Sequence, residues 1–223
     1  MKTSLIKPLL LSLVASAGLA LSAGAQGTAP VTTSSTLATP TTYASSYGLL
    51  GQDYAGIAFD YTELDSGPAK VMHSYAFEAN RPTLANTDAQ FKYEYSTVSA
   101  LGARGTEHDI SFGGTRYFGL KHFKPYIKGD LGWAFASTEN TGVDADSDSF
   151  FYLIEIGAEF QALSRLALTP YVNYSEATHF NTRGWVYGGK ATYRFAQQWS
   201  GSLKFEVTDE NDLRFGVGIN HHF

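Results

Sequence analysis

The chain has 223 residues and no Cys, and only 17% of its residues are charged, below the roughly 25% usual in soluble domains. The absence of Cys excludes disulfide scaffolds, thiolate metal sites and cysteine nucleophiles. A formal net charge of −5 disfavours binding to nucleic acid, whose phosphates attract basic proteins.

The N-terminus has the three parts of a secretory signal peptide. Lys2 and Lys7 form the charged part, residues 9–21 are rich in Leu and Ala, and Ala23-Gly24-Ala25 offers a small-x-small cleavage site. We therefore expect residues 1–25 to be removed during export by the general secretion route. An uncleaved helical anchor is disfavoured, because the apolar stretch is short for a membrane span.

Residues 26–51 are dominated by Thr, Ser, Ala and Pro and show no hydrophobic period. Such a composition cannot bury a core, so we expect a flexible periplasmic segment. The remaining residues, 52–223, form the predicted folded domain.

Ten segments of that domain alternate apolar or aromatic residues with polar or small ones, which is the period of a β-strand. Most have the ~9–11 residues that a tilted strand needs to cross a bilayer. They cover residues 53–62, 71–80, 87–96, 108–118, 125–136, 150–161, 166–175, 185–195, 199–208 and 213–223. The prediction is an all-β protein, a transmembrane antiparallel up-and-down β-barrel of ten strands, with eight or twelve as the alternatives.

The connections between these segments are longer on one side than on the other, as in outer-membrane barrels. We expect loops at residues 97–107, 137–149 and 176–184 on the extracellular side and short turns on the periplasmic side. An even number of strands places both ends of the barrel domain on the periplasmic side.

Charged residues favour the parity opposite to the apolar one, which would face the lumen. Seven acids and six bases there should pair, because unpaired charges in a confined interior are costly. We therefore expect a packed, ion-paired lumen, with a narrow solute channel as the alternative. The predicted network consists of Asp60, Glu78, Lys92, Glu94, Lys128, Asp130, Glu155, Glu159, Lys190, Arg194, Lys204, Glu206 and Arg214.

The last segment, Leu213–Phe223, alternates strictly, and it ends on an aromatic residue. Its apolar parity, which includes Phe215, Val217, Ile219 and Phe223, would face lipid, with Phe223 in the aromatic belt at the interface. As the final strand of a closed barrel, it should pair with the 53–62 segment.

Two patterns suggest chemistry but are weak. Asp144, Asp146, Asp148 and Glu155 have the spacing of an EF-hand loop, but Ser149 replaces its essential Gly and no helices flank it. The acidic stretch 139–148 could still make a loose contact with a divalent cation. His179, near Glu176, could serve a hydrolase at the barrel rim. We expect no catalytic residue, no metal site and no cofactor.

The chain resembles the small bacterial outer-membrane β-barrel proteins, the porin-like and OmpA/OmpX-like superfamily. The signal peptide, the ten segments, the stretch Pro125–Trp133 and the terminal strand carry this resemblance. It implies the outer membrane of a Gram-negative-type bacterium, contact with lipid and lipopolysaccharide, and recognition of the terminal strand by the barrel-assembly machinery. It leaves open a structural or surface-interaction role, a narrow porin-like channel and, third, a rim hydrolase.

Overall fold

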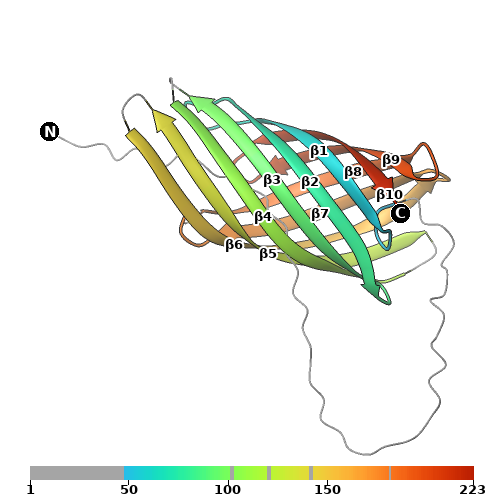
Figure 1. Cartoon of the computed structure of the whole chain (residues 1–223). Helices are drawn as coiled ribbons and strands as arrows, with labels where there is room; N and C mark the ends of the chain where they lie inside the picture. The colour runs from blue at the N-terminus through green and yellow to red at the C-terminus, as the bar shows by residue number, and fades with distance from the viewer. Residues whose placement is uncertain (1–47, 101–102, 120–121, 141–142, 181) are drawn as a thin grey trace, which may run out of the picture.

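Ten antiparallel strands close into a barrel in the computed structural model, which describes residues 48–100, 103–119, 122–140, 143–180 and 182–223 (Figure 1). The expected signal peptide and residues 26–47 lie outside the described residues. The strands are β1 Tyr54–Glu63, β2 Val71–Leu84, β3 Thr87–Ala100, β4 Ala103–Tyr117, β5 Phe123–Asn140, β6 Val143–Leu163, β7 Leu166–Ala177, β8 Thr182–Arg194, β9 Trp199–Thr208 and β10 Leu213–His222. The predicted number of strands and the predicted fold class are confirmed.

Each strand pairs with its neighbours in the sequence, and β10 returns to β1 to close the barrel. In the closing pair Ile57 lies opposite Ile219, and Tyr61 lies opposite Phe215. The predicted pairing of the terminal strand is therefore correct. We refer to the end that holds the start of β1 and the end of β10 as the periplasmic end, following the topology of outer-membrane barrels.

The predicted long loops at 97–107 and 137–149 are wrong, because most of these residues continue the strands. Thr97 pairs with Thr106, and Ser137 pairs with Asp146. Consequently β5 and β6 reach 18 and 21 residues, and only two residues separate them. These stretches are polar on both faces, so they show no hydrophobic alternation, but the hydrogen-bond ladder of the neighbouring strand still extends them.

The two ends of the barrel therefore differ in strand extension and not in loop length. The distal connections are residues 64–70, 101–102, 141–142, 178–181 and 209–212, and the periplasmic ones are 85–86, 118–122, 164–165 and 195–198. The β3–β6 wall projects beyond the rest at the distal end (Figure 1).

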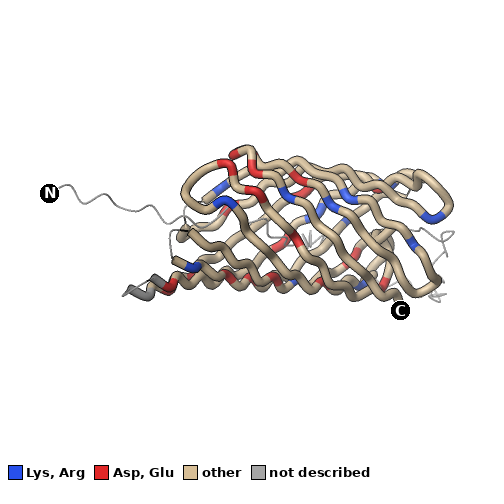
Figure 2. The backbone as a smooth tube through the Cα atoms, turned by 90° about the horizontal axis from the view of Figure 1, so that it is seen from above, with Lys and Arg blue, Asp and Glu red and all other residues tan. Residues whose placement is uncertain are grey.

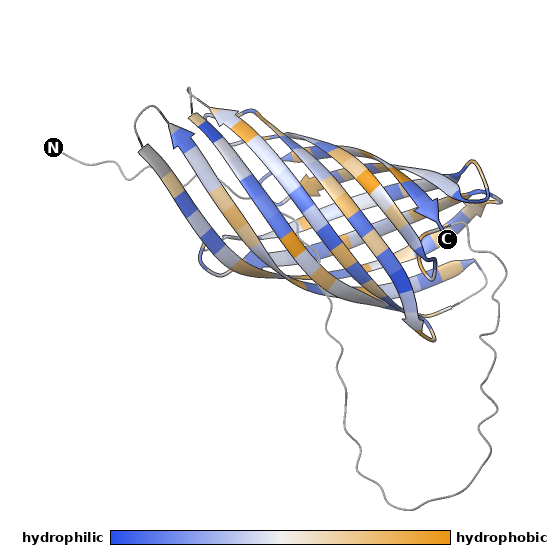
Figure 3. Cartoon of the chain, in the orientation of Figure 1, coloured by the Kyte–Doolittle hydropathy of each residue, from blue (hydrophilic) through white to orange (hydrophobic). Residues whose placement is uncertain are grey.

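The outer surface of the barrel is apolar. Ile57, Phe112 and Leu203 are each more than 60% exposed, and all belong to the parity that the sequence assigned to lipid. Figure 3 shows apolar positions recurring along the strands. A continuous apolar exterior around a closed barrel, in which every strand has two partners, is the architecture of a transmembrane β-barrel.

The interior is the reverse of a soluble core, since it holds buried charges such as Asp60, Glu94 and Arg214. Figure 2 shows acidic and basic positions on strands all around the barrel. No helix in the described part of the chain has the length and hydropathy to cross a membrane.

Candidate functional site: the charged lumen

The structure places the predicted charged residues on lumen-facing positions. Six of them are buried: Asp60, Glu94, Asp130, Glu159, Glu206 and Arg214. Six others line cavities in the lumen: Glu78, Lys92, Lys128, Glu155, Lys190 and Lys204. Arg194 lies in register with the fully buried Ser200, on the same face of the sheet.

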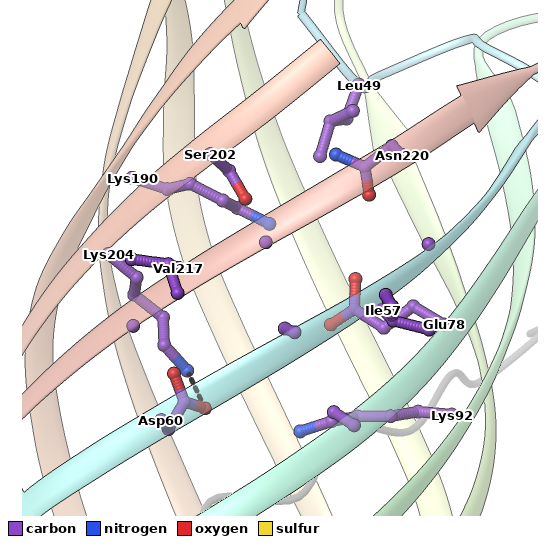
Figure 4. Close-up of a pocket in the computed structure, with 15 residues that line it drawn as sticks. Leu49, Ile57, Asp60, Glu78, Lys92, Lys190, Ser202, Lys204, Val217 and Asn220 are labelled. Carbon is purple, nitrogen blue, oxygen red and sulfur yellow. Dashed lines mark hydrogen bonds and ion pairs between the residues drawn. The ribbon is translucent and has the colours of Figure 1, made fainter. Parts of the chain in front are cut away.

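A cluster of ion pairs crosses the seam where the barrel closes. Lys204 on β9 donates to Asp60 on β1 at 2.7 Å and lies 3.5 Å from Glu206. The Arg214 guanidinium of β10 lies 3.3 Å from the same Glu206, which also accepts the Tyr171 hydroxyl at 2.6 Å. Figure 4 shows the Lys204–Asp60 contact. Charged side chains thus join β1, the first strand, to β9 and β10, the last two strands of the chain.

Gly216 allows this cluster to form. It lies on β10 in register between Asp60 and Lys204, so the ion pair spans the closing strand directly over it. A Cβ at this position would overlap the Asp60 carboxylate and lie 2.9 Å from Lys204 Cε. The alternation of Gly on the inward face of β10 therefore provides space for charges from the neighbouring strands.

Other ion pairs join residues two apart on one strand, or directly across a strand pair. Lys92 contacts Glu94 on β3, and Lys128 lies 3.7 Å from Asp130 on β5. Lys124 lies 3.7 Å from Glu159, which is its partner in register on β6.

Sequence reasoning missed four lumen-facing charges. Asp88 is buried and has the same parity as Lys92. Its inward orientation therefore follows from the alternation of the predicted 87–96 segment. Asp109 is also buried, and it has the parity opposite to the lipid-facing residues of the predicted 108–118 segment, so its inward orientation follows in the same way. Glu107 lay in the stretch assigned to a loop, and Lys124 lay one residue before the assigned start of its strand. They add three acids and one base to the predicted seven and six.

Two small polar cavities lie in the middle of the lumen, with volumes of about 100 Å³ and 40 Å³. Lys92, Lys190, Lys204 and Glu78 line both of them. In Figure 4 the side chains of Lys190 and Glu78 approach the cavity from opposite walls. The cavities have the size and polarity to hold a few water molecules.

Apolar side chains fill the lumen on both sides of these cavities. Towards the distal end, Phe151 packs with Ala134, Ala177 and Phe180. Separate small clusters join Leu153 to Val186, and Met72 to Ala69 and Val98. Towards the periplasmic end, Leu50, Tyr117 and Tyr126 pack together, with Tyr171 beside them. The polar middle of the described lumen is therefore flanked by apolar clusters on both sides, and on the distal side the buried carboxyl groups of Glu107 and Asp109 lie at the level of Ala136 and Ala134.

The EF-hand spacing has no structural counterpart, because residues 144–155 belong to the single strand β6. Within the described ranges, no group of three or more Asp, Glu or His side chains could hold a metal ion.

The suggested rim pair of Glu176 and His179 is not brought together by the observed contacts. Glu176 accepts the hydroxyls of Tyr152 and Tyr174 at 2.8 and 2.9 Å. His179 Nδ1 lies 3.2 Å from the backbone carbonyl oxygen of Asp148. The two side chains are engaged with different partners.

The two terminal histidines have opposite environments. His221 points outward and its ring contacts Trp199 and Phe223. His222 is buried, and its Nε2 lies 2.9 Å from the Ser200 hydroxyl. Since Ser200 is itself fully buried, this pair contributes to the packing of the periplasmic end.

No family model matches the chain, and no curated protein matches it. Similar solved structures include neisserial surface protein A, at 15% identity over 76% of this chain and 95% of that one, with a TM-score of 0.44. The β domain of the Bordetella autotransporter BrkA matches at 11% identity over 78% and 100%, with a TM-score of 0.49. Ail, the attachment invasion locus protein of Yersinia pestis, matches at 9% identity over 78% and 100%, with a TM-score of 0.44.

At these identities the likeness concerns the fold alone. The architecture itself is decided by the closed ring of strands, the apolar outer wall and the charged interior. The chain is a closed, ten-stranded antiparallel β-barrel of the transmembrane type.

Proposed function

We propose that the chain is an outer-membrane barrel of the structural or surface-interaction type, in which the transmembrane part is a closed scaffold. The observation that carries the proposal is the filled lumen, where ion pairs in the middle are enclosed by apolar layers. A selective channel instead needs an open constriction lined by polar or charged groups.

The projecting wall of β3–β6 is the proposed contact surface. A strand of 21 residues, at ~3.3 Å a residue, is about twice as long as a bilayer crossing requires. The part of the β5–β6 hairpin beyond the apolar band exposes Glu139, Asp146 and Asp148. Such a polar, rigid ribbon is suited to contact extracellular ligands or the polar parts of lipopolysaccharide.

Export by the general secretion route and recognition by the barrel-assembly machinery are part of the proposal. Its support is the outward orientation of the terminal strand's apolar residues: Phe215 is 49%, Val217 53%, Ile219 39% and Phe223 78% exposed. These side chains form a continuous apolar edge that a partner could bind before the barrel closes.

The purified protein is expected to give no discrete current steps in planar lipid bilayers at neutral pH. The physical reason is that apolar clusters and ion pairs occupy the described lumen, and the two polar cavities between them measure about 100 and 40 Å³, which is small for a solute path. A wide porin measured under the same conditions is the positive control. Discrete openings that disappear when Lys204 and Glu206 are neutralised together would contradict the closed scaffold.

A narrow porin-like channel is the second candidate, and the polar lining of the two cavities favours it. Lys190 has no ion pair within 4 Å among the described side chains, and it faces Glu78 across the cavity. If the cavities were part of a conducting path, Lys190→Gln would change the ratio of cation to anion permeability.

A further inference from the structure

The last residues of the predicted free periplasmic segment lie inside the periplasmic mouth of the barrel. Leu49 and Leu50 are each only 8% exposed, although both precede β1. The hydrogen-bond and packing partners of residues 49–51 include side chains from β3, β4, β5 and β6. Residues 48–51, hereafter the mouth segment, are therefore bound by the barrel, whereas residues 26–47 lie outside the described residues.

Charged side chains of the barrel wall hold the backbone of the mouth segment. The amides of Leu49 and Leu50 both donate to Glu159 Oε2, at 2.7 and 3.3 Å. The Gly51 amide donates to Asp88 Oδ2 at 2.8 Å, and Lys124 Nζ donates to the Leu50 carbonyl oxygen at 2.9 Å. Hydrogen bonds to ionised groups are about twice as strong as neutral ones. Two carboxylates and an ammonium group thus bind three consecutive peptide groups.

The site also selects the side chains of the segment. The Leu50 side chain packs against Tyr117 and Tyr126. Gly51 has a φ of +78°, which only Gly adopts readily, and a Cβ there would lie 2.6 Å from the Tyr117 hydroxyl. A Cβ at Gly48 would overlap the Glu159 carboxylate. The sequence Gly-Leu-Leu-Gly therefore fits a site that larger residues at either Gly would not fit.

The mouth segment closes the polar cavities towards the periplasm. Leu49 lines both cavities, and Leu50 lines the larger one together with Glu159 and Tyr126. We propose that Asp88, Lys124 and Glu159 form a peptide-binding site at the periplasmic mouth. The chain's own Gly48–Gly51 occupies this site as a plug that separates the charged lumen from the periplasm.

The natural absence of Cys allows a direct test by thiol labelling of the mature, folded protein in vesicles. Gln90→Cys places a thiol on the larger cavity, next to the mouth segment. In this background, Gly48→Val combined with Gly51→Val is expected to raise the rate of modification by a small charged thiol reagent at least about tenfold. In the parent, a local opening of the mouth segment must precede each reaction, whereas in the double-Val variant the segment no longer covers the cavity. The matched control is Gly119→Val, in the exposed turn after β4, where a Cβ would meet only Asn86 Oδ1, at 3.9 Å, so the rate should stay unchanged.

Two further measurements make the outcome decisive. Ser147→Cys, exposed on the distal part of β6, should react equally fast in all backgrounds, and a heat-dependent gel shift should show that each barrel is folded. In the unmodified protein, hydrogen exchange of the Leu49, Leu50 and Gly51 amides should be slowed at least about a hundredfold, because all three are hydrogen-bonded.

Equal labelling of Gln90→Cys in the folded parent and in the folded double-Val variant would overturn the plug, as would free exchange of the three amides in the unmodified protein. Either result would remove Leu50 from the periplasmic cluster, but the closed-scaffold proposal would still rest on the ion pairs and on the distal clusters around Phe151 and Met72. Conductance steps in the parent would contradict that proposal independently.

Discussion

Val217→Arg is expected to lower the free energy of unfolding of the barrel in phospholipid vesicles by about 2–4 kcal/mol. Val217 lies in the middle of β10, between Phe59 on β1 and Leu203 on β9, and its side chain is 53% exposed on the outer surface. A guanidinium at this depth must leave water for hydrocarbon, because the neighbours in register offer no polar partner. The expected loss exceeds that for most surface substitutions in soluble proteins.

Urea titrations monitored by tryptophan fluorescence measure this effect. Trp133, Trp185 and Trp199 are each at least 40% exposed on the outer surface, so all three report contact with lipid. Phe223→Arg is the matched control, since position 223 lies at the end of the barrel, where the same charge costs only ~0–1 kcal/mol. Equal losses at positions 217 and 223 would contradict the placement of β10 across the bilayer.

Lys204→Met is expected to destabilise the barrel by roughly 3 kcal/mol, the lower end of the range for breaking a buried ion pair. Lys204 lies between Asp60 and Glu206, so its loss leaves Asp60 without its only observed cationic partner among the described residues. Glu206 retains the contacts with Arg214 and Tyr171. We use the lower end because the Lys204 side chain is 21% exposed to the lumen cavity, where water screens part of the remaining charge.

The double variant Asp60→Asn with Lys204→Met should recover part of this stability, because it removes the carboxylate that Lys204→Met leaves unpaired. The same urea titration measures the two single variants and the double variant. Lys70→Met, on the exposed distal loop, is the control for loss of a positive charge. Additive effects of Asp60→Asn and Lys204→Met would show that the two residues do not interact across the closing strand.

The local alternation of the sequence was sufficient to predict the ten strands, their lipid-facing side and the closing pair. This was possible because one face of each strand must be apolar where it contacts lipid. The same signal fails beyond the bilayer, where both faces of β5 and β6 meet water. There the strand length is set by pairing with the neighbour, as between Ser137 and Asp146, which composition does not reveal.

The alternation also identified most of the charged side chains that face the lumen, but it could not show which of them form ion pairs. Asp60 and Lys204 are 144 residues apart, and only the shear of the closed barrel brings them to either side of Gly216. Glu107 and Lys124 were missed because the sequence underestimates the extent of their strands, whereas Asp88 and Asp109 lie on the inward parity of predicted segments and could have been included.

The mouth segment shows the same division. Residues 48–51 end a stretch of Thr, Ser and Pro, and Gly-Leu-Leu-Gly alone predicts no structure. The residues of the binding site, Asp88, Lys124 and Glu159, lie on strands that only the closed barrel brings around one opening. Glu159 is 110 residues from Leu49. The sequence by itself determined the barrel, its lipid-facing wall and the charged character of its interior, because each is a property of alternation along single strands. The tertiary structure decided the ion-pair partners, the projecting ribbon and the plugged mouth, because each depends on contacts between strands far apart in the chain.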